Sequence, residues 1–212
     1  MPRRDCLISG KTYHIFTKSI ARFNIFNNDT EYTRMLEVIN YYKILDPGPC
    51  FSDFQKYADK DKLMEGKEQG VGIVAYCLMP THLHLILNQY VDNGISVFMR
   101  KTLNSYSKYF NARIRRNGPL WQGRFKNVEI VTDEQLLHLT RYVHLNPVTA
   151  GIVKSPEFWK YSSYNEYLDS TKEKICNFSE ILDINKKEYC DFVASQITYQ
   201  KELSKIKHLI FE

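Results

Sequence analysis

The chain has little cysteine and no paired arrangement of it. Five cysteines are spread over 212 residues, and no Cys-x-x-Cys pair occurs. An odd number of widely spaced thiols argues against a disulfide framework and against a thiolate zinc site. These thiols are Cys6, Cys50, Cys77, Cys176 and Cys190. We therefore expect reduced cysteines and a cytoplasmic protein.

The sequence also lacks an apolar run long enough to cross a bilayer, and it shows no secretory signal peptide. We expect no membrane partner. Hydrophobic residues nevertheless make up 43% of the chain, which is too much for a disordered protein and enough for a core. The length suits one domain with appendages or two small domains.

Acidic residues are missing from one stretch, 100–126, which holds eight basic residues and no Asp or Glu. Aromatic residues are interleaved there, as in surfaces that track phosphates and stack bases. A solvated helix face balanced by acids elsewhere explains the charge equally well, and Trp121 could be a core anchor instead. The candidate DNA-binding residues are Arg100, Lys101, Lys108, Arg113, Arg115, Arg116, Trp121, Arg124 and Lys126.

The hydrophobic pattern predicts an α+β fold in which helices cover one antiparallel sheet, as in a ferredoxin-like sandwich. The expected strands are 12–20, 71–79, 82–89 and 125–131. The expected helices begin near 28–31, 94 and 133, the last with Thr132 and Gln135 as a capping box.

Three further expectations concern the connections. Residues 50–70 are charged and irregular, which indicates a loop or small insert. The helix that begins at 133 should end at about 145, before Pro147. We expect a domain over 1–155, followed by a C-terminal helical extension over 156–212 that packs on it.

His82 and His84 are two residues apart on an expected strand, so their imidazoles share one face while Leu83 points to the other. Two neighbouring imidazoles can bind one divalent cation. An isolated His-x-His pair is, however, more often two polar residues on the solvated side of a strand.

A second set of polar residues lies on the expected helix from 133. His138, Tyr142 and Asn146 are spaced four apart and form one stripe. A tyrosine hydroxyl can attack a phosphodiester when a metal polarises the phosphate, and Asn146 would add an oxygen ligand suited to Mg²⁺ or Mn²⁺. Spacing alone does not select Tyr142 over Tyr106 or Tyr109.

Four blocks in order resemble the HUH-type single-tyrosine transposases, in the REP-associated branch of the IS200-like family. The resemblance covers roughly residues 12–168. Its blocks are Met-Pro-Thr-His-Leu-His-Leu-Ile-Leu at 79–87, Gly-Pro-Leu-Trp-Gln-Gly-Arg-Phe at 118–125, Arg-Tyr-Val-His-Leu-Asn-Pro-Val-Thr-Ala-Gly-Ile-Val at 141–153 and Trp-Lys-Tyr-Ser-Ser-Tyr at 159–164. Thr81 departs from the pattern, since the family often has Asn or Glu there.

The resemblance implies a metal-dependent transposase that cleaves and rejoins single-stranded DNA through a 5′-phosphotyrosine link. It implies Tyr142 as the nucleophile, with His82, His84 and Asn146 holding Mg²⁺ or Mn²⁺. The expected partner is single-stranded DNA near a hairpin, bound by a monomer or a homodimer. Two alternatives remain, a DNA- or RNA-binding relative without chemistry and a metal-dependent hydrolase of small phosphate esters.

Overall fold

The computed structural model describes residues 6–171, 174–183 and 185–199. Its centre is one antiparallel sheet of four strands in the order β2-β3-β1-β4. The strands are β1 (Thr12–Lys18), β2 (Val71–Met79), β3 (His82–Gln89) and β4 (Lys126–Ile130). All four predicted strands are present, and the ferredoxin-like α+β fold is confirmed.

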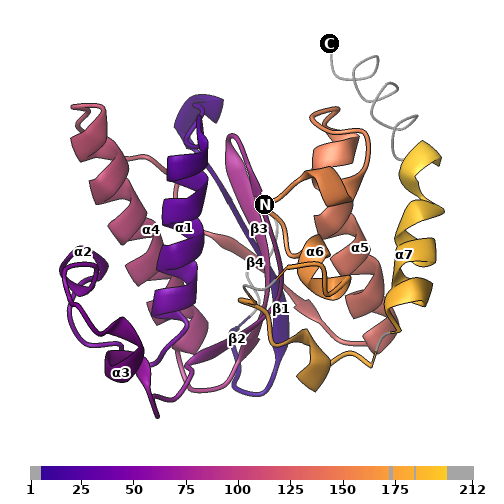
Figure 1. Ribbon diagram of the computed structural model, residues 1–212, viewed down its shortest axis with the longest axis horizontal. Helices are drawn as coiled ribbons and strands as arrows, with labels where there is room; N and C mark the ends of the chain where they lie inside the picture. The colour runs from indigo at the N-terminus through magenta and orange to yellow at the C-terminus, as the bar shows by residue number, and fades with distance from the viewer. Residues whose placement is uncertain (1–5, 172–173, 184, 200–212) are drawn as a thin grey trace.

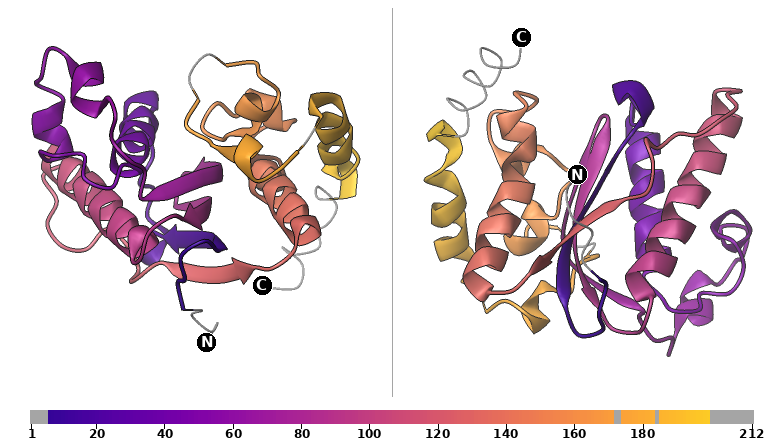
Figure 2. Two further views of the ribbon diagram at one scale, coloured as in Figure 1. Left: turned by 90° about the horizontal axis from the view of Figure 1, so that it is seen from below. Right: turned by 180° about the vertical axis from the view of Figure 1, so that it is seen from behind.

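Helices cover both faces of this sheet (Figure 1). The helices α1 (Asp29–Tyr42) and α4 (Gly94–Arg113) pack side by side on one face, and α5 (Asp133–Thr149) lies on the other. The view from below in Figure 2 shows the sheet between these two layers. Within the described residues, no helix has the length and hydropathy that a bilayer crossing requires.

The strand register decides which layer each side chain meets. Leu83, Leu85 and Leu87 belong to the core beneath α1 and α4. His82 and His84 alternate with these leucines, so they point toward the α5 layer, as the sequence predicts. That face is not an open surface, because α5 covers it and leaves His84 only 7% exposed. The solvated-strand alternative is therefore wrong for His84.

The first helix begins where the sequence predicts. The side chain of Asn28 accepts a hydrogen bond from the backbone N–H of Glu31, as an N-cap residue does. The segment 50–70 is more ordered than expected, since it contains the short helices α2 (Phe51–Phe54) and α3 (Lys60–Met64). Phe51 and Phe54 are buried against Tyr41, and this apolar contact holds the insert in place.

The predicted end of α5 is wrong, because the helix continues through Pro147 to Thr149. Proline removes one backbone donor from a helix but leaves the following bonds intact. Here Ala150 still donates its N–H to the carbonyl of Asn146 at 2.9 Å. Asn146 is therefore inside the helix, one turn after Tyr142 and on the same side.

The C-terminal extension is less regular than the predicted helical tail. Its elements are η2 (Pro156–Phe158), α6 (Tyr164–Tyr167), η3 (Phe178–Glu180) and α7 (Lys186–Ala194). A buried cluster joins α6 and α7 to α5, with Leu145, Tyr167 and Tyr189 among its members. Residues 200–212 of the predicted extension lie outside the described residues, and the division at 155/156 stays a prediction.

A buried hydrogen bond ties α7 to α5, and its removal should destabilise the protein. Nδ1 of His144 lies 2.6 Å from the Tyr189 hydroxyl, and both residues are at most 1% exposed. Tyr189→Phe leaves the imidazole nitrogen unpaired, so we expect the free energy of unfolding to fall by about 1–3 kcal/mol. Urea unfolding measures this, with Tyr199→Phe as control because Tyr199 is 55% exposed. Equal losses in both variants would contradict the prediction.

Candidate active site

Three predicted residues meet on the α5 side of the sheet. The ring centroids of His82 and His84 are 5.2 Å apart, and that of Tyr142 is 5.6 Å from His84. Both ring pairs are nearly perpendicular, at 85° and 87°. Two residues of β3 and one of α5, far apart in sequence, are therefore in edge contact within one chain.

A fourth ring, which the sequence analysis did not identify, belongs to this cluster. His14 on β1 is 8% exposed, and its Nε2 lies 3.0 Å from Nδ1 of His84. Its ring also meets Tyr142 edge-on, with centroids 6.1 Å apart. The sequence shows only a histidine on an expected strand. Its contact with His84 depends on how β1 pairs with β3, which the sequence analysis did not predict.

His82, the other histidine of β3, also has a partner for its Nδ1. The hydroxyl of Thr81 lies 3.0 Å from Nδ1 of His82. Thr81 is the residue that departs from the family pattern, and here its hydroxyl holds the ring that follows it. With Nδ1 of both His82 and His84 engaged, Nε2 is the nitrogen that each ring has left for a cation.

Burial keeps the imidazoles neutral. It lowers the pKa of His14 and of His82 to about 4, and it lowers the pKa of His84 well below its usual value. The positive charge of Lys18 lowers the pKa of His82 and His84 further. A neutral imidazole offers the lone pair that metal binding requires.

Tyr142 combines access with partial burial. Its side chain is 44% exposed, so a substrate can reach it. Partial burial raises the pKa of Tyr142, while a hydrogen bond with the Asn146 side chain lowers it. The Asn146 amide nitrogen donates to the Tyr142 carbonyl at 2.8 Å, which leaves the amide oxygen as the free acceptor.

These residues fit a divalent cation only if the amide oxygen takes part. Within residues 6–171, 174–183 and 185–199, no group of three or more His, Cys, Asp or Glu side chains is placed to hold a metal ion. Two neutral imidazoles and an amide oxygen would be a mixed N/O donor set of the kind that suits a cation retaining some of its water, and Asn146 as the third ligand stays a prediction. The identity of the ion stays a prediction.

Basic side chains lie beside the histidines. Lys18 is the cross-strand partner of His82, and Phe16, the partner of His84, is paired on its other side with Lys126. Cross-strand partners share a face, so both lysines flank the rings. A hollow of about 330 Å³ follows this edge, and its lining includes Phe16, Lys18, Arg124 and Lys126. Lys18 was not among the predicted DNA-binding residues.

A larger groove of about 640 Å³ lies against the first half of α4. Its apolar lining comes from Leu103, Trp121 and Phe125, and Arg100 and Arg124 add charge. The predicted residues Lys101 and Lys108 are also on α4, half-buried and exposed respectively. The sequence predicts one interface for these residues. In the structure Arg100 lines this groove, Lys126 lines the hollow beside β1 and Arg124 lines both, whereas Lys101 and Lys108 line neither.

Three predicted DNA-binding residues have partners inside the protein. The Trp121 indole N–H donates to Ser107 Oγ at 2.9 Å and packs against the core. Arg113 donates to the Tyr109 hydroxyl at 2.8 Å, and Arg116 donates to the Pro119 carbonyl at 2.8 Å. Arg115, with a positive φ of 54°, is exposed. A role for these four residues in DNA binding stays a prediction.

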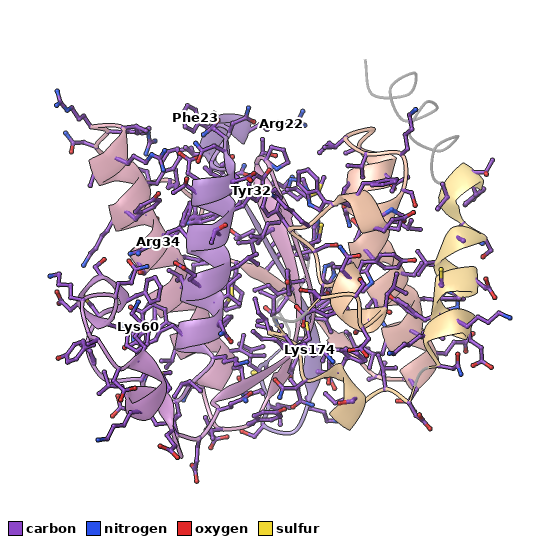
Figure 3. The ribbon with its side chains drawn as sticks, in the orientation of Figure 1. Arg22, Phe23, Tyr32, Arg34, Lys60 and Lys174 are labelled. Atoms are coloured by element: carbon purple, nitrogen blue, oxygen red, sulfur yellow. The ribbon has the colours of Figure 1, made fainter. Side chains whose placement is uncertain are left out.

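Figure 3 shows where four further basic or aromatic residues lie relative to the end of the sheet that carries His82 and Lys18. Arg22 and Phe23, just after β1, lie at the upper end of the molecule, where β1 ends and β3 begins. Lys60 and Lys174 lie in the lower half. Both Arg22 and Phe23 are exposed, and Arg22 has a positive φ of 55°.

Known proteins share the fold and its central segment. Residues 61–146 match the family model described as Transposase IS200 like. A curated Haemophilus influenzae protein, described as a REP-associated tyrosine transposase, is 28% identical over 104 residues. The match covers 43% of this chain and 58% of that protein, so the chain spans little more than half the length of this relative.

One solved structure, a REP-associated tyrosine transposase bound to a REP hairpin, has the same fold. It is 20% identical to this chain, and the two structures superpose with a TM-score of 0.57. The match covers 88% of this chain and 96% of that chain. The family segment 61–146 contains both histidines of β3, Tyr142 and Asn146. Residues 61–146 of the chain are therefore similar to the IS200-like transposases, and the fold is similar to that of a REP-associated tyrosine transposase.

Proposed function

We propose that this protein cleaves and rejoins single-stranded DNA through a covalent link to Tyr142, with a divalent cation held by His82, His84 and Asn146. The observation that carries the proposal is the edge contact between the rings of Tyr142 and His84, at 5.6 Å. A nucleophile beside two neutral imidazoles suits attack on a polarised phosphodiester.

The proposed reaction exchanges a phosphate ester bond of the DNA for one to Tyr142. The Tyr142 oxygen attacks phosphorus, a tyrosine–phosphate bond forms, and the bond to the 3′ oxygen breaks. The phenol proton is lost, and the released 3′ oxygen takes up a proton, which leaves a free 3′-OH and a 5′-phosphotyrosine. Rejoining is the reverse, in which a 3′-OH attacks and the proton returns to Tyr142. The covalent link conserves the ester energy, so no nucleotide cofactor is needed.

The residues around the nucleophile have separate tasks. A bound Mg²⁺ or Mn²⁺ would act as a Lewis acid on the phosphate oxygens. Asn146 donates its side-chain N–H to the Tyr142 carbonyl and so fixes its amide one helical turn from the nucleophile. Lys18 and Lys126 flank the rings and would bind the flanking phosphates.

The proposed substrate is single-stranded DNA beside a hairpin. The solved relative is described as bound to a REP hairpin, and the fold it shares with this chain supports a similar ligand. Single strands expose bases for stacking, and Phe125 and Trp121 line the groove next to Arg124. Whether one chain or two act together stays a prediction.

The charged hollow beside β1 should contribute to DNA affinity through counterion release. For a single strand, each lost phosphate contact makes the negative slope of log K against log salt about 0.7 shallower. This corresponds to a loss of affinity of about 5-fold at 0.1 M salt. We expect this from Arg124→Gln and again from Lys126→Gln. Lys60→Gln is the matched control, since Lys60 is exposed in the other half of the molecule (Figure 3). Equal slopes in all three variants would remove this hollow from the interface.

The proposal is tested by incubating the protein with labelled single-stranded DNA and Mn²⁺, followed by denaturing electrophoresis. We expect a protein–DNA adduct that carries the label of the 3′ fragment, because the 5′ phosphate of that fragment stays on the tyrosine. Chelation by EDTA should abolish it. Salt-dependent binding without any adduct would instead indicate a non-catalytic DNA-binding relative. Turnover of a simple phosphodiester without an adduct would indicate a hydrolase.

A further inference from the structure

His14 has no task in the chemistry above, although it lies within hydrogen-bond distance of a proposed metal ligand. Its Nε2 lies 3.0 Å from Nδ1 of His84 in hydrogen-bond geometry, and the two rings are nearly parallel, at 17°. Both side chains are less than 9% exposed, so water does not compete freely for this bond. A buried polar contact of this kind fixes both of its partners.

The bond between the two imidazoles has only two neutral arrangements. One ring must supply the N–H and the other must supply a bare nitrogen. If His84 donates through Nδ1, its Nε2 is bare and can bind a cation. If His14 donates instead, the proton of His84 is on Nε2, and that nitrogen cannot bind a cation.

The partner of the neighbouring histidine favours the first arrangement. Thr81 places a hydroxyl, which can accept, 3.0 Å from Nδ1 of His82. Each histidine of the pair thus has, at Nδ1, a group from outside the pair that is able to accept a hydrogen bond. Ligating histidines generally donate their other ring N–H to such a partner, which sets the tautomer and the ring orientation.

Phe16 closes the contact from the side of β1. Its ring centroid lies 5.2 Å from that of His14 and 6.1 Å from that of His84. This apolar neighbour supplies no competing hydrogen-bond partner. Nε2 of His14 and Nδ1 of His84 face each other at 3.0 Å, as a hydrogen bond requires.

We propose that His14 is a positioning residue, which accepts the Nδ1–H hydrogen bond of His84 and so holds Nε2 of His84 bare for the cation. This inference rests on the proposed function, because it assigns a partner to a ligand of the proposed metal. His14 acts through His84 and touches neither the phosphate nor the cation. The β1 strand thereby takes part in the site together with β3 and α5.

The hydrogen-bond direction can be measured without metal. Long-range ¹⁵N–¹H correlation spectra of the metal-free protein near neutral pH distinguish protonated from bare ring nitrogens. We expect His84 with its proton on Nδ1 and His14 with Nε2 bare. The chain has six histidines, so a His84→Gln variant assigns the His84 signals. A His84 proton on Nε2 would overturn the inference.

Metal affinity gives the second readout. Calorimetric titration with Mn²⁺ compares wild type with His14→Phe, which keeps a ring but has no acceptor, and with His14→Gln, whose amide oxygen can accept. Loss of such a partner typically lowers metal affinity about 10–100-fold. We expect that loss in His14→Phe and less than about 3-fold loss in His14→Gln. Thermal unfolding of the metal-free variants reports whether each one folds.

Three results would overturn the inference. His14→Phe could bind Mn²⁺ as tightly as wild type. His14→Gln could lose as much affinity for Mn²⁺ as His14→Phe while both variants fold. The bound Mn²⁺ could show coupling to a nitrogen of His14. Either of these last two results would make His14 a direct ligand. Failure of the proposed function looks different, because wild type would then bind no Mn²⁺ even with the expected tautomer in the metal-free spectrum.

Discussion

Replacing Tyr142 by Phe should abolish the covalent adduct with single-stranded DNA and leave DNA binding nearly unchanged. The substitution removes one oxygen atom from a side chain that is 44% exposed, so it creates no buried cavity. Removal of a covalent nucleophile typically lowers the rate by at least ~10³-fold, because the reaction has no other route of comparable barrier. Adduct yield per unit time is the measurement.

Two controls give this result its meaning. Tyr57→Phe removes the hydroxyl of another exposed tyrosine, 49% accessible and in the α2–α3 insert, and should form adduct like wild type. Binding of single-stranded DNA to Tyr142→Phe should stay within about 3-fold of wild type, since base stacking and phosphate contacts do not need the hydroxyl. An adduct of equal yield in Tyr142→Phe would show that another residue is the nucleophile.

The layered fold could be predicted from the sequence because local signals agreed with the tertiary structure. The alternation around His82 and His84 specified which leucines enter the core, and the caps at Asn28 and Thr132 specified where α1 and α5 begin. Each of these depends on neighbours within a few residues. Boundary errors arose where packing overrides local preference, as at Pro147, which stays inside α5.

The composition of the site was only partly predictable, for a physical reason. His14 meets His84 because β1 pairs with β3 in one register, and a shift of one residue would place it on the opposite face. Lys18 enters beside His82 by the same register. Such pairing links residues about 70 positions apart, and nothing near either residue specifies it. The internal partners of Trp121 and Arg116 depend instead on how the loop after α4 folds back on the helix, which residue spacing does not specify.

The second large effect should come from the histidine pair of β3. His82→Gln and His84→Gln each remove an imidazole from the proposed donor set of two imidazoles and an amide oxygen, so we expect the protein to lose much of its affinity for the cation. Lewis-acid stabilisation is worth several kcal/mol, which corresponds to roughly 10³-fold or more in the rate of adduct formation. EDTA should lower the wild-type rate to the same level, and added Mn²⁺ should restore only the wild type.

A structural control and a thermodynamic readout separate loss of metal from loss of fold. His138 lies on α5, exposed, one turn before Tyr142, and His138→Gln should form adduct as wild type does. A cation at 100 times its Kd stabilises the folded state by about 2.7 kcal/mol, so Mn²⁺ should raise the Tm of wild type and of His138→Gln but not of His84→Gln. If Mn²⁺ raised the Tm of all three proteins equally, the cation would bind elsewhere, and His84 would belong to the frame that holds Tyr142 and not to the metal site.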